Sequence, residues 1–304
     1  MVFKGKNMKY PESNYEEWRD EGVLVLEKFF SSDELVKIQD DFRNLYGESP
    51  TSLAHYHGNH PGSDSDRSKQ FEFIHTLPFN ASVELNLLSL HPKLISLSEE
   101  LLGSDNVVLY QSHTWAKFSG RANYNQALHC DFNNHTLTVP STEARSGSVN
   151  YLIYLSDVTE VDGPFCYVSK KDSNKILGHR CLAADKTNYS ALIQKEKMVV
   201  APAGTVIAYT LDTFHRGTDL IESDSYRYSM SISYKSNENN SIGFHVWQVT
   251  PARNWSLIMN NASPAQLSCL GIPKPGSRFW NETTIKQTKE RWPQWKSDPY
   301  IESI

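Results

Sequence analysis

The chain has 304 residues, of which 21% are charged and 12% aromatic, and its formal net charge is −5. At about 150 residues per domain this length allows two domains, although β-barrel enzymes of this size often fold as one. The composition is that of a folded globular protein, and its mild acidity argues against a broad nucleic-acid-binding surface. No apolar run approaches 18 residues, so no transmembrane helix is predicted. We therefore expect neither nucleic acid nor a membrane as a partner.

The four cysteines contain no CxxC pair, which indicates neither a zinc ribbon nor a disulfide framework. The N-terminus starts with basic residues but lacks an apolar stretch, so it does not predict a secretory signal. We expect a reducing cytoplasm as the compartment. The sequence does not predict the oligomeric state.

The first elements are a short strand within residues 22–30 and a helix that follows it directly. Ser31 and Glu34 have the spacing of a capping box, in which each side chain bonds to the backbone of the other residue. Apolar residues then recur on one helical face, and Gly47 marks the end of the helix.

A polar stretch of residues 48–67 follows, and a loop this long is typically functional or disordered. Its histidine-rich part, residues 55–67, can bury little apolar surface, and we consider two roles for it: a lid over the active site, or a solvated connector. Two short helices are predicted next, around residues 81–90 and 93–103.

From residue 106 to 236 at least six runs rich in Val, Ile, Tyr, Phe and Thr are separated by Gly, Pro and Asp turns. No long helical pattern lies between them, which favours an antiparallel sandwich or barrel over a Rossmann sheet. We predict one domain over residues 1–304: a helical N-terminal part to about 105, a β core to about 236 and a C-terminal extension to 304.

The segment ALHCDFNNH places His129 and Asp131 two residues apart, so on a strand their side chains share one face. His215 follows another predicted strand, GTVIAYT. Two histidines and one carboxylate form the facial triad of non-haem Fe(II) oxygenases, which leaves three positions of an octahedron open. An isolated HxD also occurs by chance, and the alternative for His129 is a hydrogen-bonded core histidine.

Arg227 lies twelve residues after His215, in the predicted strand SYRYSMSISY. Two antiparallel strands can place such an arginine at the far end of a pocket whose near end is the metal. Its guanidinium could then bind the distal carboxylate of a dicarboxylate through two parallel hydrogen bonds. The alternative for Arg227 is a surface salt bridge.

At this point the sequence resembles the phytanoyl-CoA dioxygenase family of Fe(II)/2-oxoglutarate oxygenases over roughly residues 15–300. The resemblance is carried by EGVLVLEKFFSSDEL, YQSHTWAKFSG with LHCD, YLIYLSDVTEVDGPFCYVSKKDS and APAGTVIAYTLDTFHRGTDL. It departs from the family pattern at residues 169–173, where SKKDS stands in place of a PGSH stretch. The fold implied is a double-stranded β-helix, a cupin-like jelly roll that is mostly β with flanking helices.

The resemblance also implies roles for individual residues. It makes His129, Asp131 and His215 the ligands of Fe(II), and it makes Arg227 the partner of the distal carboxylate of 2-oxoglutarate. Lys117 matches a family lysine upstream of the HxD. Further co-substrate contacts are implied at His113 and, offset by one residue, at Thr218, whereas Leu152 stands near a tryptophan of some members.

The activity implied is that of a 2-oxoglutarate-dependent dioxygenase, which uses Fe(II), 2-oxoglutarate and O2 to hydroxylate a small metabolite or natural-product intermediate. Asp131 favours hydroxylation over halogenation, because related halogenases lack this carboxylate. Two alternatives stay open: a non-catalytic cupin-like binding or sensor protein, and a metal-dependent hydrolase. The candidate substrate-pocket residues are Arg121, Tyr124, Phe132, Asn134 and Trp247.

Overall fold

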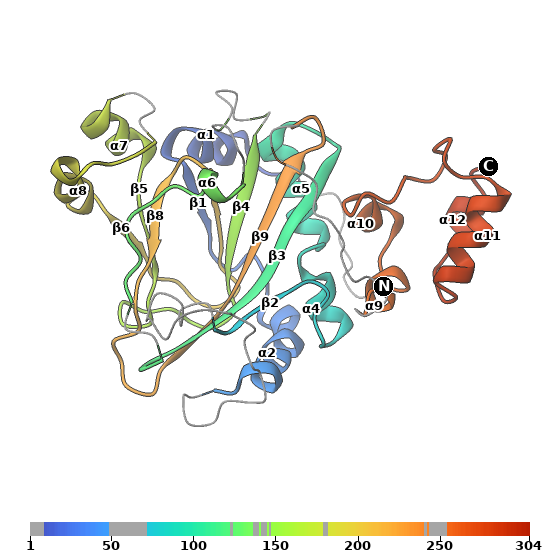
Figure 1. The fold of residues 1–304 in the computed structure, drawn as a ribbon, viewed down its shortest axis with the longest axis horizontal. Coiled ribbons are helices and arrows are strands. Elements are labelled where there is room, and N and C mark those ends of the chain that lie inside the picture. Colours follow the sequence, from blue (N-terminus) through green and yellow to red (C-terminus); the bar gives the residue numbers. More distant parts are fainter. Residues whose placement is uncertain are drawn as a thin grey trace.

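The computed structural model describes residues 9–48, 72–121, 124–135, 140, 145, 147–178, 182–239, 242 and 254–304. Two antiparallel sheets lie face to face, with helices around them (Figure 1). The larger sheet has the strand order β1-β7-β4-β9-β3-β2 and the smaller sheet the order β6-β5-β8. The strands are β1 (Val23–Leu26), β2 (Ile74–Thr76), β3 (Val107–Phe118), β4 (Ser148–Tyr154), β5 (Phe165–Val168), β6 (Lys197–Val199), β7 (Val206–Tyr209), β8 (Phe214–Gly217) and β9 (Tyr226–Ser236).

The helices begin and end close to the capping and glycine signals of the sequence. Their bounds are α1 (Glu12–Glu21), α2 (Ser32–Tyr46), α4 (Val83–Leu88), α5 (Pro92–Leu102), α6 (Phe132–His135), α7 (Lys170–Leu177), α8 (Lys186–Ile193), α9 (Ser256–Met259), α10 (Pro264–Ser268), α11 (Glu282–Arg291) and α12 (Asp298–Ile301).

Strand β9 shows how the sequence separates the two faces of the larger sheet. In YRYSMSISYK large and small residues alternate, and successive side chains of a strand point to opposite faces. Tyr228, Met230, Ile232 and Tyr234 belong to the core that the sheet shares with the helices. The other face carries Arg227, three serines and Lys235 toward the smaller sheet.

Helices α2, α4 and α5 cover the outer face of the larger sheet, and α5 contacts β3, β4 and β9 (Figure 1). The apolar core on this side is continuous from Trp18 to Tyr300, so N-terminal and C-terminal segments share it with the sheet. A separate cluster lies between the two sheets and contains Leu152, Tyr154 and Tyr209. Inner and outer clusters thus follow the period-2 pattern of the strands.

The predicted double-stranded β-helix class with flanking helices is confirmed, and the predicted strand runs of residues 106–236 become strands of the two sheets. Two eight-residue helices, α7 and α8, interrupt this region, although the sequence showed no long helical pattern there. The proposed lid of residues 55–67 lies outside the described residues, as does Trp247. In the part of the chain that the structure describes, no helix is long and apolar enough to cross a membrane.

The predicted capping box at the start of α2 is present. The Ser31 hydroxyl accepts a hydrogen bond from the Glu34 backbone, and Glu34 Oε2 accepts one from the Ser31 backbone at 2.8 Å. We expect Ser31→Ala to lower the free energy of unfolding by about 1 kcal/mol, because it leaves a helix N–H without its partner. The midpoint of urea unfolding measures this loss. Ser32→Ala, one residue inside the helix, is the matched control, and an equal loss there would contradict a capping effect.

Candidate metal centre and co-substrate site

The His129 segment is joined to β8 by a two-residue antiparallel bridge. The His129 N–H donates to the His215 carbonyl at 3.0 Å, and the His215 N–H donates to the His129 carbonyl at 2.9 Å. This reciprocal pair brings together two histidines that lie 86 positions apart in the chain. Their imidazole rings lie 4.6 Å apart, centroid to centroid.

Asp131 lies between the two imidazoles. His129 Nε2 is 3.4 Å from Asp131 Oδ1, and His215 Nε2 is 3.4 Å from Asp131 Oδ2. One ligand atom from each of the three residues lies within 4.8 Å of the other two. The three residues therefore form a cluster that could hold one metal ion.

Both histidines have their orientation fixed through the other ring nitrogen. Nδ1 of His129 lies 2.7 Å from the Ala127 carbonyl, and Nδ1 of His215 lies 2.9 Å from the Thr213 carbonyl. A carbonyl can only accept, so each Nδ1 carries a proton, and Nε2 is the ring nitrogen that faces Asp131. Metal-binding histidines are typically oriented in this way.

Tyr209 holds the carboxylate from the side of the larger sheet. Its hydroxyl donates to Asp131 Oδ2 at 3.1 Å, and its ring packs 4.8 Å from that of His215. Burial raises the pKa of Tyr209 well above its ordinary value, so the hydroxyl stays a donor at neutral pH. Phe165 stacks on His215 from the smaller sheet, with ring centroids 5.3 Å apart.

Charge and burial act against each other on the carboxylate. Burial raises the pKa of Asp131, but the charge of His215 and the hydrogen bond from His129 bring it well below the ordinary value. Burial lowers the pKa of His129, but the hydrogen bonds to Asp131 and to the Ala127 carbonyl outweigh this effect. The pKa of His129 is therefore raised above its ordinary value. The site therefore keeps an anionic oxygen beside two imidazole nitrogens, a donor set that suits Fe(II) and leaves positions open.

A second polar centre lies at one end of β9. Arg227 is buried and faces Lys117 across the β3–β9 pair, where the two residues are Cα partners. The Arg227 guanidinium donates to the Gly163 carbonyl, but its Nε is buried and has no hydrogen-bond partner among the described residues. Arg227 is therefore not the surface salt bridge that the sequence left as an alternative.

Lys117 is also buried, and its Nζ donates to the Thr218 carbonyl at 2.9 Å. Burial and the nearby charge of Arg227 lower the pKa of Lys117 to about 7. Arg227 and Lys117 both donate to backbone carbonyls among the described residues, and together they form a region of positive potential between the sheets. Such a region attracts an anion.

Of the other predicted co-substrate residues, Thr218 contacts this pair, whereas His113 and Leu152 flank the middle of β9. The Thr218 hydroxyl donates to the Pro164 carbonyl at 2.7 Å, so Thr218 meets Lys117 through its backbone. His113 lies four residues before Lys117 on β3, on the same face, and pairs with Ser231 of β9. Leu152 of β4 is the other neighbour of Ser231.

The phytanoyl-CoA dioxygenase (PhyH) family model matches residues 18–227, which is more than half of the chain and includes every residue of both centres. The chain belongs to the phytanoyl-CoA dioxygenase family. This confirms the predicted family and, with it, the prediction of an Fe(II)/2-oxoglutarate-dependent dioxygenase. No curated protein matches.

Solved structures with the same fold include EctD from S. alaskensis with 2-oxoglutarate and 5-hydroxyectoine, with a TM-score of 0.59 and 19% identity over 83% of this chain and 85% of EctD. The epimerase SnoN from nogalamycin biosynthesis, with Fe3+, α-ketoglutarate and nogalamycin RO, has a TM-score of 0.57 and 17% identity over 79% and 87% of the two chains. HygX from Streptomyces hygroscopicus, with nickel and 2-oxoglutarate, has a TM-score of 0.52 and 16% identity over 75% and 88%. At these identities the likeness shows the fold.

Of the candidate substrate-pocket residues, Phe132 packs beside Tyr110 and Leu211 near the metal cluster. Arg121 instead forms an ion pair with Glu72, with a distance of 2.6 Å. Asn134 is exposed and Tyr124 half-buried. Sequence reasoning did not find Tyr209, although it occupies an inner position of the strand that precedes His215.

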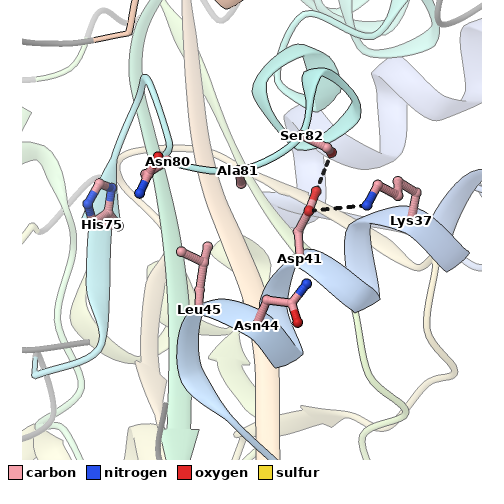
Figure 2. A pocket seen from close by; sticks show the side chains of 8 residues that line it. All are labelled: Lys37, Asp41, Asn44, Leu45, His75, Asn80, Ala81 and Ser82. Carbon is pink, nitrogen blue, oxygen red and sulfur yellow. Dashed lines mark hydrogen bonds and ion pairs between the residues drawn. The ribbon is translucent and has the colours of Figure 1, made fainter. Parts of the chain in front are cut away.

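A hollow of different character lies between α2 and the β2–α4 connection (Figure 2). Its carboxylate, Asp41, already has partners, since Ser82 donates to it and Lys37 lies 3.8 Å away. None of the residues of the metal cluster or of the Arg227 end lines this hollow. Its lining residues are Lys37, Asp41, Asn44, Leu45, His75, Asn80, Ala81 and Ser82.

We expect Asp131→Ala to abolish binding of one equivalent of Fe(II), because two imidazoles neither neutralise the ion nor complete the triad. Tyr209→Phe keeps all three ligands but loses the bond that orients Asp131, and should weaken Fe(II) binding by roughly 10- to 100-fold. Anaerobic titration with Fe(II) measures both effects. Tyr167→Phe, on the same sheet as His215, is the control, and a loss there as large as in Tyr209→Phe would contradict a specific role for Tyr209.

Proposed function

We propose that this protein hydroxylates a small molecule, with His129, Asp131 and His215 holding Fe(II) and Arg227 and Lys117 holding the distal carboxylate of 2-oxoglutarate. The observation that carries the proposal is the presence of two matched centres in one inter-sheet space. One is a cluster of two imidazoles and a carboxylate, and the other is a pair of buried basic side chains. An oxygenase of this kind needs both.

The buried Arg227 fits a dicarboxylate better than it fits a protein partner. Its Nε has no hydrogen-bond partner among the described residues. Nε and a terminal nitrogen of the guanidinium can donate together to the two oxygens of a carboxylate, which is the preferred geometry of arginine. Lys117 adds a second charge at the same level of the sheet. A carboxylate bound there would compensate the burial of both cations.

The bound iron and 2-oxoglutarate supply the oxidative chemistry, in which O2 is used to form succinate, CO2 and a hydroxylated product. The chain binds and orients the reactants. Ser229 and Ser231 are the small inner residues of β9 between the two centres, which leaves room for the co-substrate chain. Phe165, Leu152 and Tyr154 form the apolar walls that limit access of water.

One feature supports hydroxylation over halogenation. Asp131 supplies the carboxylate ligand, so the triad keeps no coordination position for a halide. The similar structures include an epimerase and a carbocyclase, so analysis of the product distinguishes hydroxylation from these outcomes. A metal-dependent hydrolase would have no use for two buried cations beyond the metal, and a non-catalytic binding protein would bind 2-oxoglutarate without forming succinate.

The free thiols of Cys130, Cys166 and Cys269, like a ferrous cofactor, suit a reducing compartment such as the cytoplasm. The experiment that tests the function is an anaerobic titration with Fe(II) and 2-oxoglutarate, followed by the metal-to-ligand charge-transfer band. A succinate assay with a library of small metabolites follows. A protein that binds iron but never gives the band would contradict the proposal.

Arg227→Ala should weaken binding of 2-oxoglutarate by about ten- to more than a hundredfold, because it removes a charge-assisted hydrogen-bonded pair of roughly 1.5–3 kcal/mol. Arg227→Lys should recover only part of this loss, since an ammonium cannot form the fork. Titration of the charge-transfer band measures the affinity. Arg121→Ala removes an exposed arginine and is the control. Unchanged 2-oxoglutarate affinity in Arg227→Ala would refute the assignment.

Binding of 2-oxoglutarate should also weaken as pH rises above about 7. The depressed pKa of Lys117, about 7, means that the free protein loses this charge in that range. A carboxylate binds the protonated amine more tightly, so affinity falls by at most about tenfold per pH unit, the limit for one proton. Lys117→Met should remove this dependence. The measurement is the dissociation constant of 2-oxoglutarate between pH 6 and 8.5, and a wild-type profile equal to that of Lys117→Met would contradict the assignment.

A further inference from the structure

We propose that the end of β9 opposite Arg227 forms the substrate site, in which Asn150 donates a hydrogen bond to an oxygen acceptor of the substrate. This inference rests on the proposed function and adds the chemistry of the substrate to it. The acceptor is a carbonyl, carboxylate or carboxamide oxygen on an apolar carbon frame, and an ammonium group does not fit.

Asn150 lies on the inner face of β4, next to the metal cluster. Its Cα partners are Tyr209 on β7 and Ser233 on β9. Tyr209 is the residue whose hydroxyl bonds to Asp131. Asn150 is therefore one strand away from the residue that orients a metal ligand.

A hydrogen bond orients the side-chain amide of Asn150, and the amide nitrogen has no partner among the described residues. Its Oδ1 accepts a hydrogen bond from the Tyr110 hydroxyl at 3.4 Å. Its Nδ2 is buried and has no hydrogen-bond partner among the described residues, while the whole residue is 1% exposed. A buried donor left without a partner is destabilising by about 1–3 kcal/mol, so such groups are rare unless a ligand uses them.

The surroundings of Asn150 are polar but carry little negative charge. The Tyr110 hydroxyl lies 2.8 Å from His135 Nδ1, and Ser148 and Ser233 also face it. Burial lowers the pKa of His135, which keeps its imidazole neutral. Among the described residues, Asp131 is the one carboxylate whose charge acts on Tyr110 or His135, and Asp131 belongs to the metal cluster.

A buried cation lies just beyond this group. Lys235 follows Ser233 on the same face of β9 and pairs with Ser148. Its Nζ donates to the carbonyls of Asn239 and Ile242 at 2.8 and 2.6 Å. Its charge favours an electron-rich oxygen in its neighbourhood and disfavours an ammonium.

The opposite wall is apolar. Leu211 and Ile242 are buried against Tyr110, and Phe132 packs on the same cluster. A substrate that fits here presents an apolar frame to these residues and an oxygen acceptor to Asn150. This combination of an apolar wall and one or two oriented polar groups is typical of small-molecule sites.

The test uses the full-length protein loaded anaerobically with Fe(II) and 2-oxoglutarate. The probes are cyclohexanecarboxylate, cyclohexanecarboxamide and cyclohexylmethylamine, which share a ring and differ in the polar group. Binding beside the metal is read from the shift of the charge-transfer band, without turnover. The acid and the carboxamide should shift the band of the wild type, and the amine should not. Comparison of the acid with the carboxamide distinguishes a charged acceptor from a neutral one.

Asn150→Leu should weaken the acid and the carboxamide by roughly tenfold, the loss of about one buried hydrogen bond, while 2-oxoglutarate affinity stays unchanged. Asn150→Asp should reverse the preference toward the amine, which keeps the test decisive if the leucine variant fails to fold. Asn44→Leu is the control, at an exposed position of α2 that lines the separate hollow of Figure 2.

The outcomes separate this inference from the proposed function. Absence of the charge-transfer band in the wild type contradicts the proposed function itself. When the band is present, three results overturn the inference. The amine shifts the band as strongly as the acid and the carboxamide, or neither the acid nor the carboxamide shifts it. The third is that Asn150→Leu leaves the affinities of the acid and the carboxamide unchanged. A loss of 2-oxoglutarate affinity in Asn150→Leu equal to that in Arg227→Ala would assign Asn150 to the co-substrate instead.

Discussion

The two backbone hydrogen bonds between His129 and His215 are the contact on which the metal cluster depends. His129 and Asp131 lie outside the named strands, so no ladder positions them, and this bridge ties their segment to β8 together with Gln126, whose N–H donates to the Gly217 carbonyl at 3.0 Å. Because each backbone both donates and accepts, the bridge fixes the distance and the direction of the two imidazoles together. The Nδ1 bonds to Ala127 and Thr213 then fix the rings, and Tyr209 fixes the carboxylate. The triad is preorganised by main-chain geometry, and side chains refine it.

The inner face of the larger sheet can be polar because the outer face is strongly apolar and stabilises the fold. Along β9, Tyr228, Met230, Ile232 and Tyr234 are buried against the helices, and burying each such side chain contributes about 1.5–3 kcal/mol. On the inner face, Arg227 Nε and Asn150 Nδ2 have no hydrogen-bond partner within the described part of the chain, which is destabilising by about 1–3 kcal/mol for each group. The stabilisation from each buried apolar side chain is similar in size to the cost of each buried polar group without a partner. Burial on the outer face can therefore offset the cost of the polar groups on the inner face. One alternating strand thus supports both stability and ligand binding.

Much of this could be predicted from local sequence, since capping, strand alternation and ligand spacing act over a few residues. Ser31 with Glu34 predicted the start of α2, and HxD with His215 and Arg227 predicted the residues that the fold brings into the inter-sheet space. Tyr209 and Asn150 were missed because their meaning depends on the register of β4, β7 and β9, which the sequence does not display. Helices α7 and α8 are only eight residues long, and propensity is a weak signal at that length.

The inner face of β9 has a cation at each end, Arg227 and Lys235, with Ser229, Ser231 and Ser233 between them. The two cations lie eight positions apart on the strand, a span of roughly 26 Å at about 3.3 Å per residue. A five-carbon diacid held by Arg227 and the metal cluster covers only part of this length. The three serines keep the remaining length of the inner face free of bulky side chains. Asp131 contacts the larger sheet at Tyr209, which is the Cα partner of Asn150. Two small molecules that approach the metal from opposite ends of one strand would therefore not compete for space, which is the arrangement that a reaction between a co-substrate and a separate substrate requires.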